Sequence, residues 1–155
     1  MASRRTGALL AFELRISFRG NDAGIGDEDV ERAVGAVLEG EGVETGVLSV
    51  TFYSSQQMRA LNRRVFGRDR ATDVIAFPMT HEDTVAGDIY VCPGAARKSA
   101  RRLKISVCEE LLRLVIHGTL HVLGYEHPEG ANRSSSAMWK LQEQYLREIS
   151  SDAGA

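Results

Sequence analysis

Two segments of the chain alternate apolar with polar residues, a pattern that predicts half-buried β-strands. The first runs from Phe12 to Phe18, and the second is GVLSVTFY, residues 46–53. Two further runs, TDVIAFP (72–78) and GDIYVCP (87–93), are short, rich in β-branched residues and closed by proline, as is typical of strands. The pattern therefore predicts about four strands.

The segments between these strands carry the residues that start helices. Asp27 is a candidate N-cap, and the pairs Ser54 with Gln57 and Ser106 with Glu109 have the spacing of a capping box. Apolar residues recur at helical spacing after each of them. The helices expected from these features are one over 28–40, a short one after residue 54, a basic one over 94–103, one from 107 to 124 and a last one over 133–150.

The helix from 107 to 124, VCEELLRLVIHGTLHVLG, is apolar around most of its circumference and should lie at the centre of the fold. Gly124 should end it. Strands and helices in this order predict an α+β fold, in which a small mixed sheet of about four strands packs against helices. We expect one domain over 1–155, with residues 1–7 disordered.

Composition fits this picture and narrows the class of protein. A chain of 155 residues suits a single core, and its 26% charged residues are ordinary for a globular protein. The chain holds no apolar run near twenty residues, so no transmembrane helix is expected. Its two cysteines, Cys92 and Cys108, form no CxxC motif, and we expect reduced thiols and a cytoplasmic location.

The net charge of −2 does not suggest nucleic-acid binding, but the charge is unevenly distributed. Residues 59–70 hold five arginines against Asp69 alone, and residues 97–104 hold five basic residues and no acid. Such clusters are either solvated helix faces or phosphate-binding surfaces. The candidates for RNA contacts are Arg64, Arg68, Arg70, Arg97 and Arg101.

Three of the four histidines fall within the eleven residues HGTLHVLGYEH. His117 and His121 would leave the same helix face one turn apart, and the turn at Gly124 would let His127 approach them. Three imidazoles are a common set of ligands for one catalytic zinc ion, with the fourth position left for water. Zinc would lower the pKa of that water to about 7. The alternatives are hydrogen-bonded core histidines, or a structural zinc, for which neither cysteine is suitably spaced.

Gly118 directly follows the first histidine, where zinc peptidases with this spacing carry the glutamate that acts as general base. A zinc peptidase is therefore disfavoured. A glycine inside a helix costs about 1 kcal/mol relative to alanine. We expect a packing or an access reason for Gly118, for example a substrate or another backbone that approaches the metal closely where the Cβ is missing.

Three blocks of the sequence resemble the YbeY family of bacterial endoribonucleases. They are LNRRVFGRDRATDVIAFP (61–78), GDIYV (87–91) and the histidine motif itself. The resemblance implies a metal-dependent hydrolase that holds one zinc ion through His117, His121 and His127. It also implies action on RNA in 16S rRNA 3′-end maturation and small-subunit quality control. Ribosomal RNA and the small ribosomal subunit are then the expected partners.

The chain departs from the family pattern at two positions. Glu126 stands where the family usually has aspartate, and it is the first candidate for a general base. Phe66 stands where the family usually has an arginine, whose charge Arg64, Arg68 or Arg70 could supply instead. This departure keeps open a second function, that of a non-catalytic, zinc-containing ribosome-assembly factor.

Overall fold

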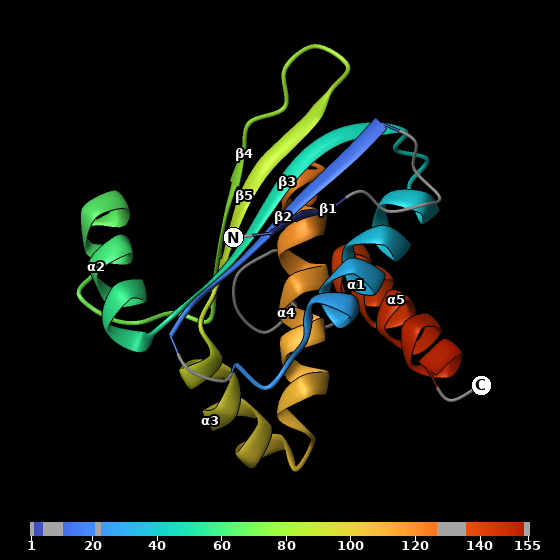
Figure 1. Ribbon diagram of the computed structural model, residues 1–155. Coiled ribbons are helices and arrows are strands. Elements are labelled where there is room, and N and C mark those ends of the chain that lie inside the picture. Colours follow the sequence, from blue (N-terminus) through green and yellow to red (C-terminus); the bar gives the residue numbers. More distant parts are fainter. Residues whose placement is uncertain (1, 5–10, 21–22, 127–135, 154–155) are drawn as a thin grey trace.

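The computed structural model describes residues 2–4, 11–20, 23–126 and 136–153, which form one mixed sheet and five helices (Figure 1). The strands are β1 (Ala2–Arg4), β2 (Ala11–Arg19), β3 (Thr45–Tyr53), β4 (Val74–Pro78) and β5 (Val85–Val91). The helices are α1 (Asp27–Gly40), α2 (Ser55–Phe66), α3 (Pro93–Leu103), α4 (Val107–Val122) and α5 (Ala137–Ala153).

The sheet has the strand order β1-β2-β3-β5-β4, which confirms the α+β class. The three central strands are parallel, and an antiparallel strand closes each edge. The strand β1 differs from the disorder expected for residues 1–7. It carries no apolar alternation, but its pairing with β2, Ala2 opposite Ile16, uses backbone hydrogen bonds that a side-chain pattern does not reveal.

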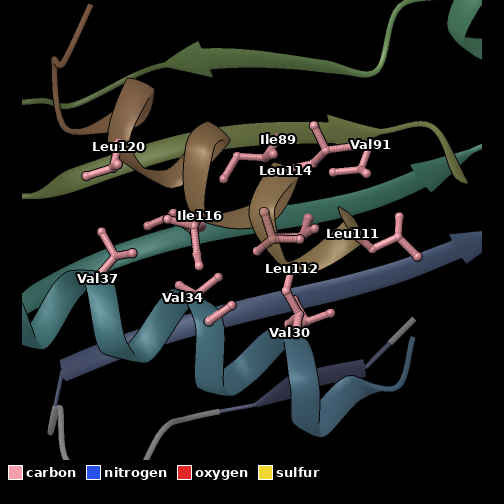
Figure 2. Close-up of a cluster of buried hydrophobic side chains, with 14 of the residues drawn as sticks. Val30, Val34, Val37, Ile89, Val91, Leu111, Leu112, Leu114, Ile116 and Leu120 are labelled. Atoms are coloured by element: carbon pink, nitrogen blue, oxygen red, sulfur yellow. The ribbon is translucent and has the colours of Figure 1, made fainter. Parts of the chain in front are cut away.

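The two faces of the sheet are covered unequally. Helices α1, α4 and α5 lie on one face, and α2 lies on the other, next to β4 (Figure 1). Figure 2 shows α4 side chains between α1 and the central strands, so α4 occupies the centre of the core as predicted. The labelled residues of this cluster are Val30, Val34, Val37, Ile89, Val91, Leu111, Leu112, Leu114, Ile116 and Leu120. None of the helices described is long and apolar enough to cross a membrane.

The helix starts follow the predicted capping residues, with one shift. The Ser54 hydroxyl accepts a hydrogen bond from the Gln57 amide, and the Gln57 side chain accepts one from the Ser54 amide, so this capping box is confirmed. Ser106 likewise accepts from the amide three residues on. The N-cap of α1, however, is Gly26 and not Asp27, because the Asp29 carboxylate already satisfies the Gly26 amide.

Gly118 permits close packing of α4 on the sheet. A Cβ atom at this position would lie 2.6 Å from Cγ2 of Ile89 in β5 and 3.3 Å from Cγ2 of Val74 in β4. Of the two expected reasons for Gly118, the structure therefore shows packing: side chains of the sheet, and not a substrate or another backbone, fill the space. The sequence could not show this, because it does not reveal which strand α4 packs against.

We expect Gly118→Ala to destabilise the protein, although alanine is the better helix former by about 1 kcal/mol. The added methyl would overpack the interface between helix and sheet, which typically costs about 1–3 kcal/mol. Gly35→Ala in α1 is the matched control, because a Cβ there meets no atom within 4 Å. Urea unfolding should show a loss of stability for Gly118→Ala and a gain for Gly35→Ala. Equal gains would contradict the packing argument.

Candidate functional site

A cleft of about 570 Å³ runs beside the edge strand β4 and is lined by several of the predicted site residues. Its walls come from the end of α2, the loop that leads to β4, β4 itself, and the end of α4 with the turn that follows it. Among the predicted site residues, His117, His121, Glu126, Arg68 and Arg70 all line this cleft.

The Nε2 atoms of the first two histidines of the motif, His117 and His121, face each other. Their Nε2 atoms lie 3.0 Å apart, and their ring planes meet at 81°. His117 is only 5% exposed, so its ring is fixed by packing. Two nitrogen ligands bound to one zinc at 2.0–2.1 Å in tetrahedral geometry would lie about 3.3 Å apart. The observed pair is close to that arrangement.

The Nδ1 atom of each ring faces an oxygen atom, and this contact determines the tautomer of the neutral ring. Nδ1 of His117 lies 2.6 Å from Oε1 of Gln142, and Nδ1 of His121 lies 2.9 Å from the carbonyl oxygen of Tyr125. Because these oxygens only accept hydrogen bonds, both Nδ1 atoms must donate. In the neutral rings, both Nε2 atoms then direct lone pairs into the same small space. Lone pairs that converge in this way suit a shared cation.

A charged network holds Gln142 in the orientation that His117 needs. The Gln142 amide nitrogen donates to the Glu143 carboxylate, so its oxygen must face His117. Arg113 binds Glu143 through two nitrogens, at 2.9 and 3.0 Å, and donates to Glu110 at 2.7 Å. Burial would raise the pKa of Glu143, but the hydrogen bonds from Arg113 and Gln142 outweigh it and hold that pKa below its usual value. The network therefore remains charged at neutral pH.

The turn that ends α4 positions the Tyr125 carbonyl oxygen that accepts the hydrogen bond from His121. Gly124, at φ +101°, donates to the carbonyl of His121, and Tyr125 donates to the carbonyl of Leu120, which together form a Schellman motif. This turn directs the Tyr125 carbonyl back to His121. Gly124 thus ends the helix as predicted, and it also sets the direction of a site residue.

Tyr125 is itself fixed through its hydroxyl group. Tyr125 and Tyr145 donate to the two carboxylate oxygens of Glu41, at 2.5 and 2.6 Å. The hydrogen bond to Glu41 raises the pKa of Tyr125, and burial and the same carboxylate raise the pKa of Tyr145, so both hydroxyls stay protonated. Gly40 leaves room for this contact, because a Cβ there would collide with the Tyr145 hydroxyl.

The third histidine of the motif, His127, lies outside the described residues. Within those residues, no group of three or more His, Cys, Asp or Glu side chains is placed to hold a metal. His117 and His121 nevertheless fit a metal, since both present an unprotonated Nε2 to one point. The cysteines do not contribute: Cys92 is buried in the cluster under α2, and Cys108 lies at the other end of α4.

The structure separates the five candidate arginines for RNA. Arg68 and Arg70 line the cleft with the histidines, whereas Arg97 lines a smaller cavity beside Phe18 and Pro93. Arg64 and Arg101 line neither of these two cavities. Two other arginines of the 59–70 cluster are taken up by Asp69, which binds Arg59 at 2.8 Å and Arg63 at 3.0 Å. The positive charge in the cleft is therefore carried by Arg68 and Arg70.

Two carboxylates line the cleft, Glu126 and Asp73. The Asp73 side chain accepts a hydrogen bond from the adjacent Val74 amide, which is a turn role. Glu126 is exposed and directly follows Tyr125, whose carbonyl oxygen orients His121.

The sequence analysis missed Gln142, Glu143 and Arg113. The sequence does contain a signal for Gln142, because this polar residue lies on the apolar stripe of the last helix, between Met138 and Tyr145. The structure shows that Gln142 is indeed buried, with 1% of its surface exposed.

Comparison with known proteins gives consistent matches. The model of the family described as Endoribonuclease YbeY matches residues 15–150. A Thermotoga maritima protein named Endoribonuclease YbeY is 40% identical over 102 residues, 66% of this chain and 67% of that protein. One from Persephonella marina is 31% identical over 135 residues, 84% and 88% of the two chains. The solution structure of TM1509 from Thermotoga maritima matches with a TM-score of 0.65 at 33% identity, over 90% of both chains.

We expect Arg113→Met to lower the free energy of unfolding by about 3 kcal/mol, the lower end for a buried ion pair, because it leaves the buried Glu110 and the partly buried Glu143 without their partner. Arg59→Met is the matched control. Its ion pair with Asp69 is exposed and screened by solvent, so stability should hardly change. Urea unfolding of both variants measures the difference. If the two variants lose similar amounts, the network around Gln142 does not stabilise the fold.

Proposed function

Since the chain belongs to the YbeY family of endoribonucleases, hydrolases that cut phosphodiester bonds in RNA, we propose that it is a zinc-dependent endoribonuclease. The observation that carries the zinc dependence is the convergence of the His117 and His121 Nε2 atoms in a cleft that also holds Arg68 and Arg70. His127 would complete the set of ligands, with one zinc ion per chain. Zinc, when bound, polarises phosphate oxygens and activates water at neutral pH.

Residues of the chain itself would bind the phosphates and accept the proton. Arg68 and Arg70 bind the phosphates next to the scissile bond, because guanidinium groups match phosphate geometry and keep their charge. Glu126 accepts the proton of the attacking water, since its exposed carboxylate lies in the same cleft. Gly118 has no side chain to act as a base, so the cleavage of peptides has no support in this site.

Within this activity, we propose 16S rRNA 3′-end maturation and small-subunit quality control as the biological role. The resemblance of the three sequence blocks to the family supports this part. The partners would be ribosomal RNA and the small ribosomal subunit, and the location would be the cytoplasm. Arg64, Arg97 and Arg101 lie outside the cleft and would contact the RNA beyond the site of cleavage.

Incubation of the purified protein with small-subunit rRNA precursor should give cleavage that is lost in His117→Ala. His81→Ala is the matched control, because this fourth histidine is exposed in the loop before β5 and lines no part of the cleft. It should cleave like the unchanged protein, and the loss of cleavage in His117→Ala, purified in the same way, then excludes a contaminating nuclease. Equal cleavage by the unchanged protein, His117→Ala and His81→Ala would contradict the proposal. Zinc bound without any cleavage would favour the non-catalytic assembly factor.

We expect Gln142→Leu to weaken zinc binding by about 10–100-fold, the usual effect of losing the group that orients a histidine ligand. The leucine keeps the volume but no longer accepts the hydrogen bond from Nδ1 of His117. Gln144→Leu is the control on the same helix, since Gln144 is exposed and donates to Glu148 on the surface. Competition with a chromophoric chelator measures both affinities independently of activity. Equal affinities for the two variants would contradict the role of Gln142.

A further inference from the structure

The last residue of α2, Phe66, presents an exposed aromatic ring to the cleft. Its side chain lines the same cleft as His117 and His121, and the residue is 53% exposed. A phenyl ring of this size normally stabilises a protein by being buried. An exposed ring that lines the same cleft as the site residues is available to contact a ligand bound there.

The ring of Phe66 is held at a fixed inclination by a row of aromatic residues. It lies parallel to Phe77 of β4, with centroids 6.5 Å apart and planes within 2°. Phe77 meets Tyr90 edge to face at 5.8 Å, and Tyr90 packs on Tyr53 at 5.0 Å. The contact between Phe66 and Phe77 joins α2 to the sheet, and Phe77 is the one aromatic neighbour of Phe66 among the residues that the structure describes. The row therefore produces a flat apolar platform that needs no rearrangement to receive a planar ligand.

The charges around this platform identify the ligand. Arg68 and Arg70 follow Phe66 within four residues and line the same cleft. The one acid of this segment, Asp69, is bound by Arg59 and Arg63 and does not oppose them. The cleft is mixed in charge, because the carboxylates of Asp73 and Glu126 line it as well, and Arg68 and Arg70 are its guanidinium groups. Arginines next to an exposed aromatic ring are the arrangement that binds single-stranded nucleic acid: cations hold the phosphates and a base stacks on the ring.

We propose that Phe66 is the stacking platform for an unpaired base of the RNA, next to the phosphate held by Arg68 and Arg70. This inference rests on the proposed endoribonuclease function and adds a residue that contacts the substrate. A base in a duplex is stacked on its neighbours and cannot reach the ring, so contact with Phe66 requires an unpaired base. It favours no particular base, because every base has an aromatic face.

The test measures equilibrium binding of a short fluorescent single-stranded RNA by anisotropy, with the full-length, zinc-loaded protein and a gel to verify that the RNA stays intact. Phe66→Leu should weaken binding by about tenfold, and Phe66→Trp should preserve it or strengthen it. Phe18→Leu is the matched control. Phe18 is also an exposed ring, 37% exposed and stacked on Phe52 at 4.8 Å, but it lies outside this cleft. It should bind like the unchanged protein.

The decisive measurement combines Phe66→Leu with RNAs that lack one base at successive positions. At the stacked position, removal of the base should weaken binding to the unchanged protein about tenfold and leave binding to Phe66→Leu unchanged. Phe66→Trp should retain the dependence on the base, which separates stacking from a loss of stability in Phe66→Leu.

The stacking proposal is overturned if every abasic RNA loses the same factor with both proteins, or if Phe18→Leu weakens binding as much as Phe66→Leu. A base-dependent effect of Phe66 without any rRNA cleavage would contradict the nuclease but retain the platform. Cleavage that depends on His117, without any base-dependent effect of Phe66, would remove the platform alone.

Discussion

The site depends on one hydrogen-bonding constraint: both imidazoles on α4 donate from Nδ1 to an oxygen atom, so both neutral rings direct the lone pair of Nε2 into the same space. An imidazole whose Nδ1 had no acceptor could adopt either tautomer or rotate away. The two acceptors differ in kind, a side-chain amide for His117 and a backbone carbonyl for His121. Either one alone would fix only half of the site.

The rest of the fold holds these two acceptors in place, and α5 contributes to both. Through Gln142 and Glu143 it connects His117 to Arg113, and through Tyr145 it binds the Glu41 carboxylate that also holds Tyr125. Charges removed from water are costly unless they are paired or hydrogen-bonded, and here Arg113 pairs with Glu143 while two tyrosine hydroxyls donate to Glu41. Because these pairs join α5 to α1 and α4, the fold and the geometry of the site are maintained by the same contacts.

Much of the fold follows from local patterns. The alternation from Phe12 to Phe18 and the capping box at Ser54 place a strand and a helix start within a residue or two of their observed bounds. Two features escaped this reasoning for physical reasons. The strand β1 is defined by backbone pairing with β2, and Gly118 is required by side chains of β4 and β5 that are distant in the sequence.

The sequence by itself determined the chemistry available to this protein: the spacing of His117 and His121 on one helix face, the helix stop at Gly124 and the run of arginines before β4. Helical periodicity and glycine conformation are local properties, so they can be read from the chain. Only the tertiary structure decided the tautomers of the histidines, which arginines share their cleft, and that Phe66 is exposed there. Each of these depends on residues far apart in sequence that packing brings together.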